Sequence, residues 1–232
     1  MLSDKFVSGI RRLVPAACLL CSVNAAESGL CRECERSLPR LAPARCPTCA
    51  APTPGSEVCG RCIDRAPRFD RVVAALAYAF PADSLITSLK YGRNLAAARP
   101  LAFALAQSID REPYPDCVIA MPIARDRLAQ RGFNQAVQIA HLACREFGLR
   151  ISENVVRRLR SGVPQASLPW KERAKNVRGV FACNADFTSK SIAVVDDVLT
   201  AGATLNELAA TLKKSGAREV VGWICARTVA GA

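Results

Sequence analysis

Residues 191–205 read SIAVVDDVLTAGATL, and this stretch decides the fold. The apolar run at residues 192–195 is typical of a strand that is buried on both faces. Two adjacent carboxylates, Asp196 and Asp197, follow the run, and a turn of small and hydroxyl residues comes next. A helical pattern then continues over residues 206–214. The order of strand, acid pair, turn and helix predicts one unit of an α/β fold.

The turn after the acid pair has the chemistry of an anion site. A strand that passes through glycine and hydroxyl residues into a helix presents backbone N–H groups to an anion, and the helix dipole adds to the attraction. Acids beside such a turn cannot bind the phosphate, but they suit the hydroxyl groups of a sugar that carries it. The stretch therefore predicts a site for a ribose 5-phosphate. A turn with a solvated pair of acids is the alternative interpretation.

The sequence VVDDVLTAGAT at residues 194–204 resembles the ribose-phosphate-binding motif of type I phosphoribosyltransferases. The resemblance implies that the acids hold the ribose hydroxyls of phosphoribosyl pyrophosphate (PRPP), which binds with Mg²⁺, and that the loop wraps its 5-phosphate. The family often has a second Thr or Ser where this chain has Ala201, so one hydroxyl donor is missing while backbone donors remain. The expected PRPP-binding residues are Asp196, Asp197, Val198, Thr200, Ala201, Gly202, Ala203 and Thr204.

Length and composition limit the possible classes of protein. A chain of 232 residues can form one ordinary domain with a small appendage, and half of its residues are hydrophobic, which is enough for a buried core. The net charge of +12 favours an anionic partner such as a nucleotide or a nucleic acid. No apolar run approaches the ~20 residues that span a bilayer. Residues 1–17 are expected to form a short amphipathic docking helix rather than a membrane anchor.

Eight of the twelve cysteines form four CxxC pairs, separated by nine, eleven and nine residues. Such spacing is typical of zinc ligands, and a segment this short and broken needs metal for its stability. We expect two structural Zn²⁺ in Cys₄ sites, with sequential or interleaved pairing both open, and one zinc with a decayed second site as the alternative. The other four cysteines are expected to be buried, so the cysteine content favours a reducing, cytoplasmic location. The expected ligands are Cys18, Cys21, Cys31, Cys34, Cys46, Cys49, Cys59 and Cys62.

The remaining chain predicts a doubly wound parallel sheet with its ligand at the carboxyl ends of the strands. Residues 1–66 are expected to form the zinc-binding module and residues 67–232 the phosphoribosyltransferase-like domain. The lone histidine, His141, lies within a predicted helix, which argues against a catalytic Ser/His or Cys/His unit. Strands are expected within 69–80, 117–121, 151–159 and 219–226, and helices within 85–91, 95–109 and 136–147, the last with Val137, Ala140, Cys144 and Phe147 inward.

Basic residues are concentrated between positions 125 and 178, with twelve Lys or Arg against four acids. A departing pyrophosphate needs positive charge, so Arg125, Arg127 and Arg131, together with Gly132, are candidates for that side of the site. A solvated basic face is the alternative. The polar segment at residues 160–178 is expected to be a lid over the ligand. Its candidate contacts are Gln165, Lys171, Arg173, Lys175, Asn176 and Arg178.

Several blocks together resemble the ComF family of competence proteins. They are the CxxC pairs, LKYG at 89–92, MPIARDRLAQRGFNQA at 121–136, PQASL at 164–168, NVRGVF at 176–181 and the ribose-phosphate motif. The resemblance implies a phosphoribosyltransferase that releases pyrophosphate, carries a zinc-finger module and takes part in natural transformation with single-stranded DNA and other competence proteins. Members often have Thr at the position of Gly162, which leaves the first lid contacts open. The alternatives are a non-catalytic protein that binds PRPP, a nucleotide or DNA, and a plain zinc-finger DNA-binding protein.

Overall fold

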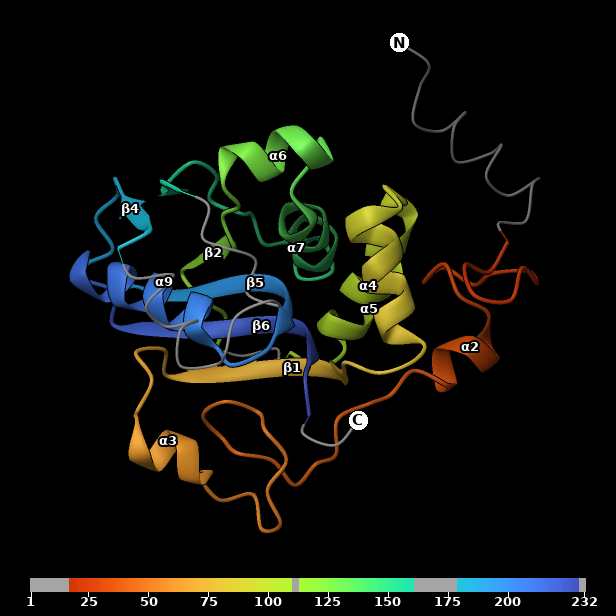
Figure 1. Cartoon of the computed structure of the whole chain (residues 1–232), viewed down its shortest axis with the longest axis horizontal. Coiled ribbons are helices and arrows are strands. Elements are labelled where there is room, and N and C mark those ends of the chain that lie inside the picture. The colour runs from red at the N-terminus through yellow and green to blue at the C-terminus, as the bar shows by residue number, and fades with distance from the viewer. Residues whose placement is uncertain (1–16, 110–112, 161–178, 230–232) are drawn as a thin grey trace.

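The computed structural model describes residues 17–109, 113–160 and 179–229. Its centre is a four-stranded sheet in the order β1-β6-β5-β2, in which all neighbouring strands are parallel (Figure 1). The strands are β1 (Arg71–Ala77), β2 (Cys117–Ala120), β5 (Ser191–Leu199) and β6 (Glu219–Arg227). The predicted parallel sheet is therefore confirmed.

Helices cover both faces of the sheet (Figure 1). Ala193 and Val195 of β5 pack into one hydrophobic core with the first helical layer, whereas Ile192 and Val194 pack into the other core with α9 (Ala203–Lys214). This alternation follows from the strand geometry, since successive side chains point to opposite faces. The first layer contains α4 (Ala82–Tyr91), the 3₁₀ turn η1 (Leu95–Ala97), α5 (Ala98–Ala106) and α7 (Gln135–Arg145).

Gly222 of β6 lets α9 approach the sheet closely. A Cβ atom at this position would lie 2.7 Å from Cδ2 of Leu205 and 3.2 Å from Cγ2 of Val72. Leu205 lies in the first turn of α9, so the glycine determines how deeply the start of this helix is seated. The position of the turn between β5 and α9 depends on this contact.

The predicted strand over residues 151–159 is shorter than expected and belongs to another sheet. The strand that forms there is β3 (Val156–Arg158), which pairs antiparallel with β4 (Phe181–Cys183). Ile151 and Ser152 reach the main sheet, through an isolated parallel bridge of Ile151 to Val118 and a hydrogen bond of 2.7 Å from the N–H of Ser152 to the carbonyl of Val118. The left-handed backbone of Asn154, with φ of 61°, interrupts the extended chain between these two places.

Residues 125–131, for which the sequence analysis predicted no helix, are helical. Helix α6 (Arg125–Arg131) ends at Gly132, whose φ of 83° is the left-handed conformation that favours glycine at a helix end. The expected inward face of α7 is correct for Ala140 and Cys144, but Val137 and Phe147 are only half-buried. Ile139 and Ala143 are buried instead, so the face that packs on the sheet is rotated from the predicted one.

The cysteine-rich segment packs directly against the α/β fold. Leu30 and Leu38 are buried in the core that contains α5, and the carbonyl of Pro39 accepts a hydrogen bond of 2.7 Å from the N–H of Ala77 at the edge strand β1. Two short helices, α2 (Arg32–Arg36) and α3 (Gly60–Asp64), lie within the segment. The division at residues 66 and 67 stays a prediction. Most of the expected N-terminal helix lies outside the described residues.

No helix in the described ranges combines the length and the apolar character that crossing a membrane requires.

Candidate functional site

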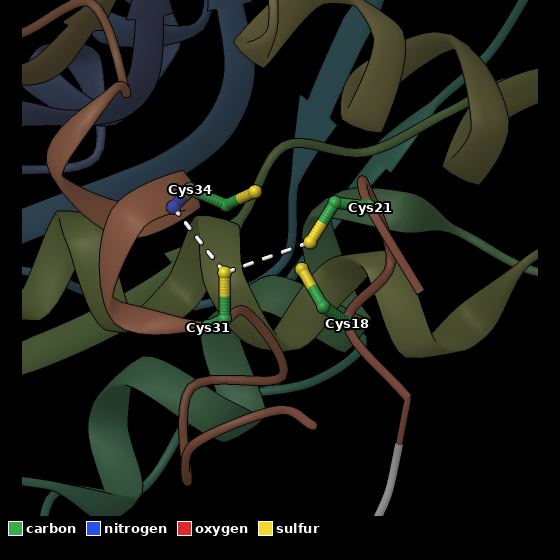
Figure 2. A group of neighbouring side chains, drawn as sticks. All are labelled: Cys18, Cys21, Cys31 and Cys34. Atoms are coloured by element: carbon green, nitrogen blue, oxygen red, sulfur yellow. Dashed lines mark hydrogen bonds between the residues drawn. The ribbon is translucent and has the colours of Figure 1, made fainter. Parts of the chain in front are cut away.

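The eight CxxC cysteines gather into two groups in sequential order. Within each group the sulfur atoms all lie within 4.8 Å of one another. Figure 2 shows the four thiols of the first group pointing toward a common centre. Four thiolates at this spacing suit the tetrahedral coordination of zinc, so the structure fits two structural Zn²⁺. The groups are Cys18, Cys21, Cys31 and Cys34, hereafter cluster 1, and Cys46, Cys49, Cys59 and Cys62, hereafter cluster 2.

Backbone N–H groups around each cluster prepare the thiols for metal. In cluster 1 the N–H of Cys34 donates to Sγ of Cys31 at 3.5 Å, and in cluster 2 the N–H of Cys59 donates to Sγ of Cys46 at 3.4 Å. Burial opposes ionisation of Cys18 and Cys46, but hydrogen bonds from neighbouring backbone groups outweigh it and lower the pKa of each thiol to about 6. Each cluster therefore contains a thiol that ionises readily, as a metal ligand must.

The acid pair lies at the carboxyl end of β5, and Asp197 has a cationic partner. Nζ of Lys90, at the end of α4, lies 2.6 Å from Oδ2 of Asp197, and the two side chains are only 19% and 5% exposed. Burial acts to lower the pKa of Lys90, but the charges of Asp197 and Asp196 outweigh it and raise this pKa. We had not assigned Lys90 to the site. Its only signal in the sequence is the LKYG block, to which we gave no role.

Asp196 has a different environment from Asp197. Its side chain is half-buried, and one of its carboxylate oxygens accepts a hydrogen bond of 2.9 Å from the N–H of Asp197. Burial, together with the adjacent charge of Asp197, raises the pKa of Asp196 well above its ordinary value. The ionised form of Asp196 is therefore unfavourable until a polar or cationic group binds beside it.

The loop between β5 and α9 consists of the residues that the sequence analysis expects to bind a phosphate. Gly202 is the residue before the helix and has a φ of 79°, a conformation that residues with a Cβ rarely adopt. Helix α9 begins at Ala203, so its first N–H groups lie at the end of this loop, where the helix dipole is positive. Val198, Thr200, Ala201, Ala203 and Thr204 are all half-buried. Residues 199–204 are called the phosphate loop below.

The three candidate arginines of α6 have different surroundings. Arg131 lies over the ring of Tyr91, 5.4 Å from its centroid, which places it beside the end of α4 that carries Lys90. Arg127 is half-buried, and its charge adds to the effect of burial in lowering the pKa of Arg158. The charge of Asp196 opposes this shift, so Arg158 lies in the electrostatic surroundings of the acid pair. Sequence reasoning had not assigned Arg158 to the site.

Arg125 and Gly132 line a separate cavity of about 740 Å³ beside strand β2. Its wall combines apolar atoms of Ile119 and Val156 with polar side chains of Asn134 and Arg158. Of the predicted pyrophosphate group, Arg131 lies beside the end of α4, whereas Arg125 and Gly132 line this cavity. The six predicted lid contacts lie outside the described residues.

Comparisons with known proteins found a family match for the cysteine-rich segment and relatives of nearly the whole chain. The double zinc ribbon domain matches residues 9–63. The DNA utilization protein YhgH of Escherichia coli O6:H1 is 32% identical over 224 residues, which cover 93% of this chain and 99% of that protein. Competence protein F of Haemophilus influenzae is 30% identical over 221 residues, covering 90% and 96%. A purine phosphoribosyltransferase structure from Pyrococcus horikoshii Ot3 has a TM-score of 0.33 at 25% identity, over 55% of this chain and 71% of that one, and adds nothing to the topology.

The fold defines an α/β protein with a parallel sheet, joined to an N-terminal double zinc ribbon. The chain belongs to the competence protein F family.

The paired thiol clusters lead to a prediction about metal content. The purified protein should contain about two Zn²⁺ per chain, measured by elemental analysis, because both clusters offer four thiols. Chelation should lower the melting temperature, since metal binding supplies folding free energy. Less than one equivalent of zinc, or disulfides between these cysteines in protein purified under reducing conditions, would contradict the prediction.

Replacing each of the two acids by its neutral amide should change the stability of the protein in opposite directions. Asp196→Asn should stabilise the ligand-free protein at pH 7 by about 1 kcal/mol or more, roughly 2–4 °C in melting temperature, because it removes a carboxylate with a raised pKa. The raised pKa means that ionisation costs stability as the pH rises, so the difference from wild type should vanish below about pH 4, where the carboxyl is protonated in both the folded and the unfolded chain.

Asp197→Asn should instead destabilise the protein by about 3 kcal/mol, because it leaves the buried Lys90 without its counter-charge. The double variant Lys90→Met with Asp197→Asn should recover most of this loss, since it removes both members of the ion pair together. Melting curves of the four proteins, by calorimetry, give the comparison. Equal effects of the two single variants would show that the acids share one environment.

Proposed function

We propose that this protein binds PRPP with Mg²⁺ and transfers its phosphoribosyl group to an acceptor, with release of pyrophosphate. The observation that carries the proposal is the order of groups at one end of β5, where the acid pair with Lys90 is followed directly by the phosphate loop. A ribose 5-phosphate needs oxygen acceptors for its hydroxyls and N–H donors for its phosphate, and these are the groups that this end of the strand provides.

In this proposal each group has a separate role. The carboxylates of Asp196 and Asp197 accept hydrogen bonds from the ribose hydroxyls, and their charge stabilises the positive charge that develops on the ring as the bond to pyrophosphate breaks. Lys90 holds Asp197 in place, because the ion pair joins the end of α4 to the end of β5. The first N–H groups of α9 and the loop bind the 5-phosphate.

The pyrophosphate side requires positive charge. Arg131 lies beside the end of α4 that carries Lys90, and Arg127 belongs to the same helix α6, so both are candidates to neutralise the leaving group. Mg²⁺, when bound with PRPP, supplies further neutralisation, and the carboxylates of the acid pair are hard oxygen donors of the type that it prefers. The cavity beside β2 would accept the second substrate. Because its wall has both polar and apolar atoms, this substrate could be a planar molecule that forms hydrogen bonds.

Ligand binding tests the proposal directly. PRPP with Mg²⁺ should raise the melting temperature of the wild-type protein, and Asp196→Asn should abolish this shift, because the ribose loses a charged acceptor. Glu146→Gln is the matched control, since it removes one carboxylate charge from the exposed end of α7 and should leave binding unchanged. A pyrophosphate-release screen of acceptors then tests turnover. Failure of PRPP to bind the wild-type protein, by thermal shift and calorimetry, would reject the proposal.

A second candidate function is the binding of single-stranded DNA. The relatives carry the names DNA utilization protein and competence protein, and this chain has a net charge of +12. A role in competence, other competence proteins as partners and a cytoplasmic location all stay predictions. If DNA uses the arginines near the acid pair, its binding should be non-catalytic, weak and sensitive to salt, because it depends on phosphate contacts.

Competition distinguishes the two candidate functions. We expect PRPP with Mg²⁺ to displace an oligonucleotide of about 20 nucleotides in fluorescence anisotropy, and we expect Arg127→Gln to weaken DNA binding severalfold as one phosphate contact is lost. Arg218→Gln, an exposed arginine before β6, is the control for net charge alone. DNA binding that is indifferent to PRPP and to Arg127→Gln would place the DNA on another surface.

A further inference from the structure

Arg227, the last residue of β6, is a buried arginine that no motif had identified. Its side chain is only 3% exposed, although it ends a strand at the same edge of the sheet as the acid pair. Burying a guanidinium is costly unless its N–H groups find acceptors. The acceptors that it uses are backbone carbonyls and, at 3.2 Å, the hydroxyl oxygen of the neighbouring Thr228.

Three of the carbonyls bound by Arg227 come from two distant parts of the chain. Nη1 donates to the carbonyl oxygens of Leu199 at 3.1 Å and Thr200 at 2.6 Å, which are the first residues of the phosphate loop. Nε donates to the carbonyl oxygen of Cys49 at 3.1 Å, and Cys49 is a thiol of cluster 2. One buried side chain therefore joins the backbone of a zinc ribbon to the backbone that precedes the phosphate site.

Two further contacts connect the same regions. Phe69 follows the zinc ribbon and packs beneath the loop, because a Cβ atom at Gly202 would lie 3.7 Å from Cε1 of its ring. The N–H of Arg68 donates to Oδ1 of Asn206 in the first turn of α9 at 2.7 Å. Cys49, Phe69, Gly202 and Arg227 line one common cavity of about 170 Å³. The loop thus lies beside cluster 2, joined to it through Arg227 at Leu199 and Thr200 and supported by Phe69 at Gly202.

Cluster 1 has no equivalent connection among the residues that the structure describes. Its thiols Cys18 and Cys31 are buried with α4 and α5 in the core on one face of the sheet, whereas Cys46 and Cys49 belong to the core on the face of α9. Metal gives a Cys₄ segment its backbone conformation. Loss of the metal from cluster 2 alone would therefore displace the carbonyl that anchors Arg227.

We propose that Arg227 is a positioning residue for the phosphate loop, and that metal in cluster 2, but not in cluster 1, holds the loop in its binding conformation through this residue. The effect on PRPP rests on the proposed function. The effect on the backbone requires no ligand, so the two parts can be tested separately.

The first experiment measures amide exchange in the ligand-free protein. The N–H of Thr228 donates to the carbonyl of Leu199 at 3.1 Å, and the N–H of Asn206 donates to that of Gly202 at 2.9 Å, so both amides report on the loop. Cys62→Ser, in cluster 2, and Arg227→Met should increase the exchange rates of both amides by about tenfold or more. The loss of one charge-assisted hydrogen bond produces an effect of this size. Arg227→Lys should give an intermediate rate, because it keeps a charged donor but not the fork.

Two matched variants control for zinc loss and for contact loss. Cys21→Ser should remove about one zinc from cluster 1, as Cys62→Ser does from cluster 2, yet leave both amides unchanged. Arg45→Gln removes another guanidinium contact of the ribbon, the 3.3 Å hydrogen bond to the carbonyl of Ala74 in β1, and should also leave them unchanged. Equal effects of Cys21→Ser and Cys62→Ser, or no effect of any Arg227 variant, would overturn the proposal.

The second experiment measures PRPP affinity with Mg²⁺ by calorimetry in the same variants. Cys62→Ser and Arg227→Lys should weaken binding by about tenfold, while Cys21→Ser and Arg45→Gln keep the wild-type value. Unchanged affinity in the cluster 2 variants would overturn the link between metal and ligand. If the wild-type protein does not bind PRPP, the proposed function fails, and the exchange rates alone decide whether Arg227 positions the loop.

Discussion

The structure depends on one electrostatic constraint. Strand β5 is buried on both faces, and the two adjacent carboxylates near its end need partners for their charges. The core residues of β5 before Asp196 are fully buried, so neither acid can be solvated from that side. Lys90 compensates Asp197 at 2.6 Å, and this requires the end of α4 to lie against the end of β5. The ion pair therefore links the position of the acid pair to the position of α4 in the first helical layer.

The two acids are equivalent in sequence but not in chemistry. Asp197 is paired and has a structural role in addition to any contact with a ligand. Asp196 has the raised pKa and its side chain is half-buried, so it gains most from a bound polar group. A ligand that offers hydroxyl donors at this place would relieve a cost that the empty protein carries. This is the physical basis for a site that is destabilised by itself and stabilised by its ligand.

The zinc ribbon packs against the α/β fold and contributes residues to its hydrophobic cores. Its two clusters bury thiols in the cores on opposite faces of the sheet, and the segment between them contacts the edge strand β1. Because cluster 2 lies beside the phosphate loop through Arg227, the metal sites have unequal importance for the ligand site. A module that sequence reasoning treats as a separate source of stability is thus part of the environment of the site.

The sequence by itself determined the features that depend on local pattern. The apolar run before Asp196, the glycine at position 202 and the CxxC spacing predict the strand, the turn and the thiol clusters, because each depends on neighbouring residues in the chain. Tertiary structure alone decided the pairing of Lys90 with Asp197, the approach of Arg158 to the acid pair and the bridge from Arg227 to Cys49. These contacts join residues far apart in the chain, such as positions 90 and 197, or 49 and 227, and only packing brings them together. The helix at residues 125–131 and the displaced strand β3 were mispredicted for the same reason, since a polar segment has no periodic pattern that reveals which surface it will cover.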